Sequence, residues 1–448
     1  MIFPNAKYVF RIRLHVPWLV PKRAGAASAV DTLSKPALRI ALLALAAAFI
    51  AGTARAENSV PAGLEAALRL TISRHPAVAG KRAEVRSKDY AIGTARAAML
   101  PSISVQASSQ DNHTHPVTLQ ASQPIWAFGR ISSGIAYAKA DKAADEADLL
   151  RVERQLVEQT ATAYANVLGA RTRLAIAADD VTRLEGLYER IRRRRNRQMA
   201  SDADVSLALA RLNQSRAQRA NDQSSLAIAI DALKALTQAP VAADRPVPKS
   251  VTRLPDDKAL MALAETESAD IRLKSKKVAV AVADVDKTSS ASMPTVSLQV
   301  QRYYNQPYYG DKVHYGIVLH ASLDSLGFAT VEQTGSAAAL QQAAVEDLNS
   351  TRNDLENTVK SLLRNRDLQQ TLLENQGQSV KELTSLMVSY ERQYEAGYKS
   401  WLDLLNIQRE LTTQRLQLAQ AENSWLVYTL KLAVLSGRLD TLAGIQQE

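Results

Sequence analysis

Two stretches of the chain carry apolar residues at helical spacing over far more residues than an ordinary helix contains. No proline interrupts residues 129–195 or 328–393, and apolar residues recur there at steps of three and four. Side chains at this spacing form one stripe along an α-helix. At about 1.5 Å per residue, each helix would be roughly 100 Å long. The pattern predicts two long coiled-coil helices, each paired antiparallel with a shorter helix that follows it, at 203–236 and 401–435.

Four short segments show a different pattern, in which apolar and small polar residues alternate. Ile103 and Val105 alternate with serine and glutamine, and residues 296–300 show the same alternation. This period of two is typical of β-strands. It also matches the strands of membrane barrels, whose apolar side chains face lipid while their polar side chains face the lumen. We therefore predict two β-hairpins, over residues 101–124 and 294–324.

The order of these segments repeats along the chain. The recurring landmarks, at offsets of 193 to 199 residues, are LPSISVQ at 100–106 and MPTVSLQ at 293–299, Gly129 and Gly327, and Ser-x-x-Asp at 201–204 and 400–403. Three landmarks in the same order indicate a tandem duplication. We expect a first repeat at 57–239 with a helical hairpin at 129–238, a linker at 240–256, a second repeat at 257–439 with a helical hairpin at 328–436, and a C-terminal tail at 440–448.

The predicted fold is mainly α-helical with a small membrane β-barrel. One chain supplies too few strands to close that barrel. One chain supplies four predicted strands, whereas the smallest membrane barrels have about eight and open strand edges do not occur in lipid. The strands must therefore close between chains. Two chains would give eight strands and three would give twelve, and periodicity does not choose between them.

The first 56 residues have the features of an export signal. An apolar run at 40–50 follows Lys35 and Arg39, and the small-residue motif Ala-Arg-Ala precedes Glu57. The run is shorter than the ~20 residues that a membrane-spanning helix needs. We therefore expect residues 1–56 to be a signal peptide and the mature chain to act outside the cytoplasm.

Charge and cysteine content exclude several classes of protein. Eight basic residues and one acid give residues 1–56 a charge of +7 out of the total of +10, so the rest of the chain is too balanced for a nucleic-acid-binding surface. The absence of cysteine excludes disulfides, thiolate metal sites and a lipid-modified N-terminal cysteine. No catalytic or nucleotide-binding motif occurs, and the adjacent Asp179 and Asp180 would diverge on a helix. We expect no enzymatic activity, cofactor or metal, since His113 and His115 in a polar loop only weakly indicate metal binding.

Three further motifs lie where the predicted elements meet. Residues 123–130 (QPIWAFGR) join a strand to a long helix, residues 394–406 (YEAGYKSWLDLLN) form the second helical turn, and residues 435–439 (LSGRL) close the second repeat. Together with the repeated hairpins, these motifs resemble the TolC family of outer-membrane factors, from about Asn58 to Leu439. The resemblance implies a homotrimer with a twelve-stranded barrel in outer-membrane lipid, continued by a helical tunnel through the periplasm. It also implies two partners, a periplasmic adaptor protein and an inner-membrane transporter.

The resemblance assigns roles to residues of the second helical turn. In the family, the hairpin tips close the periplasmic mouth and rings of inward aspartates narrow it; Asp403 matches the first such position and Asn406 stands at the second. Tyr394 and Lys399 match tip positions whose links hold the mouth closed, and Gly397 matches the glycine of the turn. One carboxylate from each of three chains would favour cations. Asp403 is alternatively part of a Ser-x-x-Asp helix cap, and the two roles are compatible.

The first helical turn departs from the family pattern. Gln198 stands where glycine is expected, and Arg192 to Arg195 together with Arg197 make this turn basic. Asp204 corresponds to the aspartate of the second turn. The arginines either stabilise the carboxyl end of a solvated helix or dock an acidic partner in the periplasm.

Trp126 lies at the predicted junction between the second strand and the first long helix. Tryptophan is enriched at membrane–water interfaces, where its ring is half apolar and half hydrated. We expect Trp126 to lie at the lower rim of the barrel, with simple core packing as the alternative.

Three functions fit these features. The first is the outer-membrane exit duct of a type I secretion system, which passes an unfolded protein from an inner-membrane transporter and its adaptor. The second is the outer duct of a drug-efflux pump, and the third is a periplasmic coiled-coil scaffold without a channel. The missing N-terminal cysteine disfavours the lipid-anchored efflux factors, and residues 400–406 (SWLDLLN) look like the tips of members that export large adhesins. We therefore favour secretion over efflux, and the alternating strands argue against the scaffold.

Overall fold

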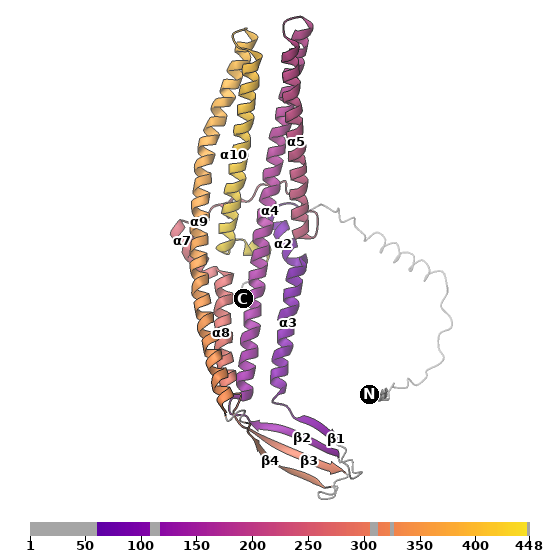
Figure 1. Ribbon diagram of the computed structural model, residues 1–448, viewed down its shortest axis with the longest axis vertical. Coiled ribbons are helices and arrows are strands. Elements are labelled where there is room, and N and C mark those ends of the chain that lie inside the picture. The colour runs from indigo at the N-terminus through magenta and orange to yellow at the C-terminus, as the bar shows by residue number, and fades with distance from the viewer. Residues whose placement is uncertain (1–60, 108–116, 305–311, 323–326, 446–448) are drawn as a thin grey trace, which may run out of the picture. The chain divides into compact units, whose positions relative to one another are not determined.

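The computed structural model of this protein describes residues 61–107, 117–304, 312–322 and 327–445 (Figure 1). The chain separates into a unit of residues 1–59 and a unit of residues 60–448, and every described residue belongs to the second. The predicted signal peptide lies outside the described residues.

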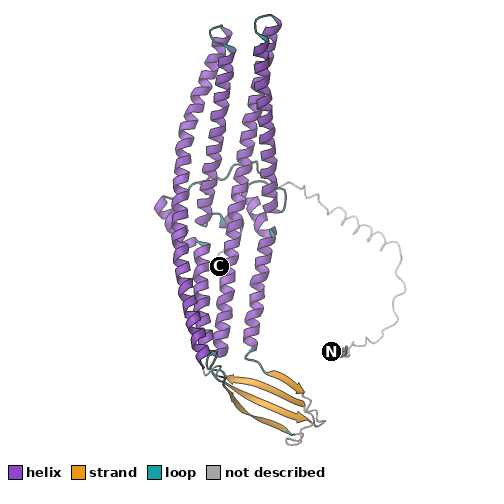
Figure 2. Cartoon of the chain, in the orientation of Figure 1, coloured by secondary structure: helices purple, strands orange, loops and turns teal. Residues whose placement is uncertain are grey.

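Two long helical hairpins make up most of the described chain (Figure 2). They are α4 (Arg130–Asn196, 67 residues) with α5 (Asp202–Thr237), and α9 (Phe328–Glu395, 68 residues) with α10 (Trp401–Leu435). Each long helix packs against the helix that follows it, and α4 also packs against α10 of the other hairpin. Near the two turns, apolar residues of all four helices share one core, in which Leu184 of α4 and Leu212 of α5 meet Met387 of α9 and Leu411 of α10.

The shorter helices precede the strands, connect the two halves or follow the second long hairpin. They are α2 (Leu64–Arg74), α3 (Pro76–Ala97), α6 (Lys249–Thr252), α7 (Asp257–Glu267), α8 (Ala269–Ser289) and α11 (Asp440–Ala443). Helix α3 packs on α4, whereas α8 lies between α4 and α9. Within the chain, α3 therefore covers one long helix and α8 touches both.

The four strands form one antiparallel sheet. They are β1 (Ser102–Ala107), β2 (Val117–Trp126), β3 (Thr295–Tyr304) and β4 (Val313–His320), in the order β1-β2-β3-β4. The central pair, β2 with β3, joins the two halves of the chain. Strands β1 and β4 each pair on one side only, so their outer edges have no partner strand among the described residues. The predicted fold class is thus confirmed, with long α-hairpins and two β-hairpins in one chain.

A second core surrounds the point where α2, α10 and α11 meet the middle of α4. Tyr164 of α4 is fully buried there, and its hydroxyl donates a hydrogen bond of 2.7 Å to the carbonyl oxygen of Arg245. Beside this core, the Arg154 guanidinium donates to the Asp440 carboxylate at 2.6 Å and also to the Glu267 carbonyl oxygen. Asp440 is only 1% exposed, so this ion pair fixes the C-terminal segment to α4 out of contact with solvent.

Ion pairs rather than apolar contacts attach α3 to α4. Val78 is the one buried residue that the 22-residue α3 contributes. Lys81 contacts Asp145 and Asp148, and Lys88 contacts Asp141 and Asp145. Burial alone lowers the pKa of Lys81, but its hydrogen bonds to acidic neighbours outweigh burial and raise the pKa above the ordinary lysine value. This interface is therefore polar and sensitive to ionic strength.

No helix in the described part of the chain is both long enough and apolar enough to cross a membrane.

Candidate functional site

One face of the sheet is apolar and exposed. The side chains on this face include Ile103 and Val105 of β1, Leu119 and Ala121 of β2, Leu298 and Val300 of β3, and Tyr315 and Ile317 of β4. Ile103 is 75% exposed and Tyr315 is 83% exposed. A contiguous apolar surface of this kind indicates contact with another protein or with lipid. Along each strand, these apolar side chains alternate with small polar side chains that lie on the opposite face. This pattern favours contact with lipid over contact with another protein.

Trp126 lies where that apolar face meets the helices. It ends β2 just after a β-bulge, and its register partner Val296 belongs to the apolar face. The Trp126 ring is 62% exposed and meets the Phe128 ring edge to face, with ring centroids 6.0 Å apart. An exposed aromatic pair at this end of an apolar sheet face suits a membrane–water boundary. The interfacial role of Trp126 stays a prediction.

The two helical turns, each about 100 Å along a long helix from the sheet, have the same backbone structure. In the second turn, the Tyr398 amide donates to the Gln393 carbonyl and the Gly397 amide donates to the Tyr394 carbonyl. In the first turn, the Met199 amide donates to the Arg194 carbonyl and the Gln198 amide donates to the Arg195 carbonyl. Both patterns are the Schellman motif that ends helices with one left-handed residue.

Gln198 adopts the left-handed conformation that glycine would supply. Its φ is 58°, and Gly397 at the corresponding position of the second turn has a φ of 82°. A side chain in this region meets the following carbonyl oxygen, at a cost of about 1–2 kcal/mol. The departure from glycine therefore strains the first turn without changing its shape.

Matching capping boxes begin the two helices after the turns. The Ser201 hydroxyl accepts from the Asp204 amide while the Asp204 carboxylate accepts from the Ser201 amide, and Ser400 and Asp403 repeat this exchange. A side-chain hydrogen bond from Ser400, followed by the backbone bond, lowers the pKa of Asp403. A backbone hydrogen bond from Ser201 is the largest cause of the lowered pKa of Asp204. Both carboxylates therefore stabilise their helices at neutral pH, and this stabilisation is lost as the pH falls through their lowered pKa values.

Arg194 connects the first turn to the second. Its guanidinium donates a hydrogen bond of 2.7 Å to the Tyr394 hydroxyl, and its central carbon lies 4.8 Å from the centroid of the Tyr394 ring. Tyr394 is only 8% exposed and belongs to the core shared by both hairpins. The sequence places Arg194 within a basic run but gives no sign that this arginine, rather than Arg192 or Arg195, reaches the other hairpin.

The remaining arginines of the first turn differ in how they are engaged. Arg192 pairs with Glu189 at 3.2 Å on its own helix, and Arg195 pairs with Asp202 at 2.7 Å across the turn. No ion pair joins Arg193 or Arg197 to another described residue, and both are exposed. The cluster therefore combines local helix-end contacts with two unpaired surface cations.

At the second turn, Lys399 and Asn406 occupy different environments. The Lys399 ammonium lies 4.4 Å from the centroid of the Tyr390 ring, a cation–π contact within its own hairpin. Asn406 is exposed one turn along α10 from the half-buried Asp403. The structure thus brings Tyr394 together with Arg194 and Lys399 together with Tyr390, while Asp403 and Asn406 lie on the first turns of α10.

Asp180 forms a junction that the sequence did not indicate. Its carboxylate accepts hydrogen bonds from Ser215 of α5 at 2.6 Å, and from Gln408 and Thr412 of α10 at 2.9 and 2.7 Å. The neighbouring Asp179 instead pairs with Arg415 at 2.8 Å. The two carboxylates diverge and are both engaged, so they do not form a catalytic pair.

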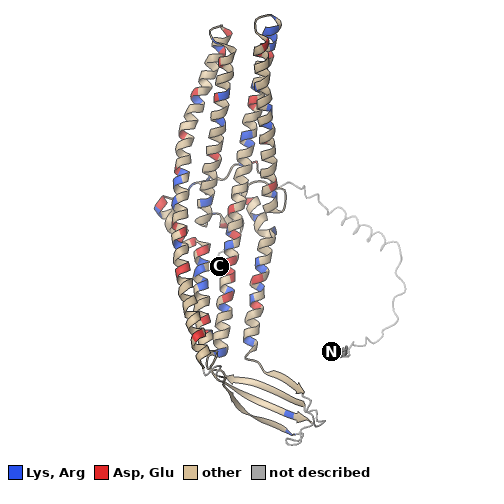
Figure 3. Cartoon of the chain, in the orientation of Figure 1, with Lys and Arg blue, Asp and Glu red and all other residues tan. Residues whose placement is uncertain are grey.

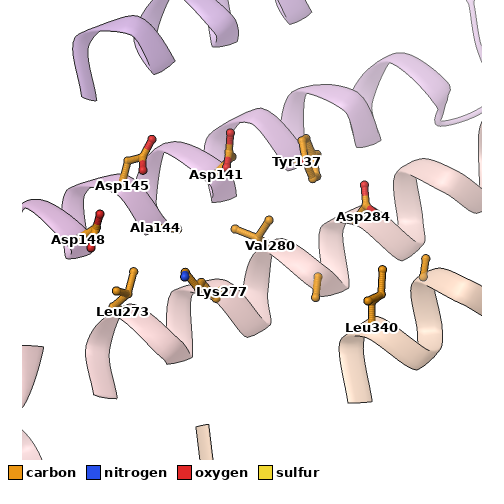
Figure 4. A pocket seen from close by; sticks show the side chains of 12 residues that line it. Tyr137, Asp141, Ala144, Asp145, Asp148, Leu273, Lys277, Val280, Asp284 and Leu340 are labelled. Carbon is orange, nitrogen blue, oxygen red and sulfur yellow. The ribbon is translucent and has the colours of Figure 1, made fainter. Parts of the chain in front are cut away.

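A cavity of about 390 Å³ between α4, α8 and α9 carries several aspartates (Figure 4). Asp141, Asp145 and Asp148 line it from α4, and Lys277 lines it from α8. All three α4 carboxylates are engaged by lysines of α3, and Asp284 of α8, which also lines the cavity, pairs with Lys287. The cavity therefore does not present a free acidic cluster. Among the described residues, no group of His, Cys, Asp or Glu could hold a metal ion, and the pair His113 and His115 lies outside them.

A protein-family model described as outer membrane efflux protein matches residues 67–238 and 260–438, so this chain belongs to that family. This confirms the resemblance to the TolC family and locates the chain in the bacterial outer membrane, from which its helices extend into the periplasm. Members of this family are channels, so the expectation of a transport protein rather than an enzyme or a scaffold is confirmed.

Individual relatives agree with this assignment. The alkaline protease secretion protein AprF of Pseudomonas aeruginosa is 25% identical over 362 residues, which cover 74% of this chain and 71% of AprF. The outer membrane protein VceC of Vibrio cholerae is 17% identical with a TM-score of 0.69, covering 86% of this chain and 97% of VceC. The CmeC outer membrane channel of Campylobacter jejuni is 13% identical with a TM-score of 0.71, covering 86% of this chain and 90% of CmeC. At such identities, the two solved structures establish a shared fold.

The strain at Gln198 gives a testable prediction about the turns. Gln198→Gly should stabilise the first turn by up to about 1 kcal/mol, because glycine adopts a positive φ without steric conflict. The matched variant Gly397→Gln should destabilise the second turn by a similar amount. Hydrogen exchange of the Met199 and Tyr398 amides, which close the two motifs, measures each effect locally. Equal exchange rates before and after both substitutions would show that the left-handed residue is not strained.

Proposed function

We propose that three copies of this chain close into one duct across the outer membrane, through which a protein is secreted by a type I system. The observation that carries the duct is the sheet, which combines an exposed apolar face with two open edges. Open edges are not tolerated in lipid, and three four-stranded sheets would give a closed twelve-stranded barrel. The helical hairpins that continue from the sheet would then line a tunnel through the periplasm.

The choice of secretion rests on one relative. AprF is named as an alkaline protease secretion protein and aligns with about three quarters of this chain, at 74% coverage. The alternative is an efflux duct, which the description of the matching family favours. Both functions use the same fold with different inner-membrane partners.

The helical turns form the periplasmic mouth in this proposal. The Arg194–Tyr394 contact ties the two turns of one chain together and so favours the closed mouth. Asp403, with one copy from each chain, would place three carboxylates around the opening, and Asn406 would add a neutral ring one turn away. The capping geometry of Asp403 is compatible with this role, because its carboxylate remains half-exposed while it caps α10.

Two partners complete the proposed pathway. A periplasmic adaptor protein and an inner-membrane transporter would deliver the cargo to the mouth. The exposed Arg193 and Arg197 of the first turn would suit acidic side chains on the adaptor.

Single-channel recording separates the two roles of Asp403. Asp403→Asn should lower the preference for cations over anions several-fold, because it removes the fixed charge at the opening. Asp204→Asn is the matched control, since Asp204 has the same capping geometry in the first turn. If neither variant alters ion selectivity, Asp403 acts only as a helix cap; if both alter it equally, the change does not single out Asp403 and its assignment to the opening is overturned.

Comparison of cells that carry or lack this protein tests the choice of cargo. Deletion should abolish the appearance of at least one protein in the culture medium and leave drug susceptibility unchanged. Restoring the natural chain should recover that protein in the medium. Increased drug susceptibility with unchanged secreted proteins would replace secretion by efflux, while the duct itself would stand.

A further inference from the structure

In the described strands, the face of the sheet opposite the apolar face carries hydrogen-bonding groups and no Lys, Arg, Asp or Glu side chain. The side chains on this polar face belong to Ser102, Ser104, Gln106, Thr118, Gln120, Ser122, Pro124, Thr295, Ser297, Gln299, Gln301, Tyr303, His314, Gly316, Val318 and His320. At the end nearest the helices, the Thr295 hydroxyl accepts a hydrogen bond of 2.6 Å from the Arg130 guanidinium of α4. Within the four described strands, Arg302 is the only Lys, Arg, Asp or Glu residue (Figure 3). Its register partners, Leu119 and Val313, lie on the apolar face, so Arg302 does not belong to the polar face.

Three glutamines form a connected group at the centre of the polar face. Gln301 donates from Nε2 to Oε1 of Gln120 at 2.9 Å and to Oε1 of Gln299 at 3.4 Å. The Tyr303 hydroxyl donates to Oε1 of Gln301 at 2.6 Å. Gln120 and Gln301 are direct register partners on β2 and β3, so the group spans the junction between the two halves of the chain. We call Gln120, Gln299 and Gln301 the glutamine belt.

Charged side chains occur instead along the helices, and arginines cluster at the first turn (Figure 3). Six arginines occur among the eight residues 190–197 of the first turn, and Asp403 stands in the second. A section with fixed charges attracts one sign of cargo and repels the other, whereas a neutral section does neither. Any selection by charge would therefore act in the helical section, including its turns, and not at the sheet.

We propose that the glutamine belt is the surface that touches cargo in the membrane section of the duct, and that it accepts an extended polypeptide whatever the charge of its side chains. This inference rests on the proposed function, in which the polar face lines the barrel. Primary amides and hydroxyls both donate and accept hydrogen bonds, as peptide groups do. They can exchange bonds with a passing main chain without distinguishing one sequence from another.

The same face is poorly suited to small apolar molecules. Binding sites for such ligands are concave and lined mainly by apolar and aromatic side chains. Tyr303 is the one Phe, Tyr or Trp residue on the polar face of the described strands, and its hydroxyl is bonded to Gln301. The lining therefore favours a polypeptide over an apolar drug as the cargo.

The absence of cysteine from the chain allows a direct test with single-cysteine variants. Gln301→Cys would be introduced into the full-length protein in liposomes and modified with a cationic and an anionic thiosulfonate reagent. After normalisation to a free thiol, the two rates should agree within about twofold, since no Lys, Arg, Asp or Glu of the described strands lies on the same face and Arg302 lies on the opposite one. A potential of a few kT would instead separate the two rates by more than about fivefold. A long Gly–Ser peptide that contains Lys, and one that contains Glu, should slow the modification equally.

Two further variants calibrate this measurement. Val300→Cys lies one residue away on the apolar face and should resist both reagents, because lipid covers it. Gln299→Glu combined with Gln301→Cys places a carboxylate beside the reporter and should make the cationic reagent faster. This second variant shows that the assay detects a local charge.

The possible outcomes separate this inference from the duct itself. Unequal rates at Gln301→Cys, in an assay that responds to Gln299→Glu, would overturn charge-indifferent passage and leave the duct intact. Failure of both peptides to slow the modification would overturn the role of the belt in cargo contact. Modification of Val300→Cys with protection of Gln301→Cys would invert the faces and overturn the barrel on which the proposed function rests.

Discussion

The unpaired outer edges of a four-stranded sheet are the constraint on which the rest of this structure depends. Strands β1 and β4 each leave one row of backbone amides and carbonyls without a partner strand, next to a face whose apolar side chains are largely exposed. Lipid can cover the apolar face, but it cannot satisfy the open edges. The same four strands therefore require both a membrane and further copies of the chain. An outer-membrane channel of several chains meets both requirements at once.

Hydrogen bonds within the turns and between the hairpins keep the turns in a defined structure, although the turns lie far from the sheet. Each turn has a Schellman motif before it and a capping box after it, so that both ends of the connection are satisfied by the chain itself. Polar contacts then register the two hairpins against each other, through Asp180 near the middle of the paired helices and through Arg194 with Tyr394 at the turns. These contacts are directional, and apolar coiled-coil packing alone would permit sliding. In the proposed duct, opening of the periplasmic mouth would break the contact between Arg194 and Tyr394.

Most of the fold could be predicted from the sequence, because the helical and strand periodicities are long and uninterrupted. Proline-free helical stretches predicted helices that the structure places at Arg130–Asn196 and Phe328–Glu395, and alternation predicted all four strands. Contacts between the hairpins could not be predicted in the same way. Whether Arg192, Arg194 or Arg195 reaches the second turn depends on the rotation of α4 against α9, which no local pattern encodes. Gln198 shows a related limit, since the hydrogen bonds of its turn impose a left-handed residue that the side chain itself disfavours.

The number of chains in the native particle tests the central claim most directly. The protein would be extracted in mild detergent from the outer-membrane fraction, and its native mass would be measured with the detergent contribution subtracted. The account predicts three chains per particle, which would close twelve strands and leave no open edge. A monomer or a dimer in that fraction would contradict it, because neither can form the twelve-stranded barrel from which the tunnel is proposed to continue.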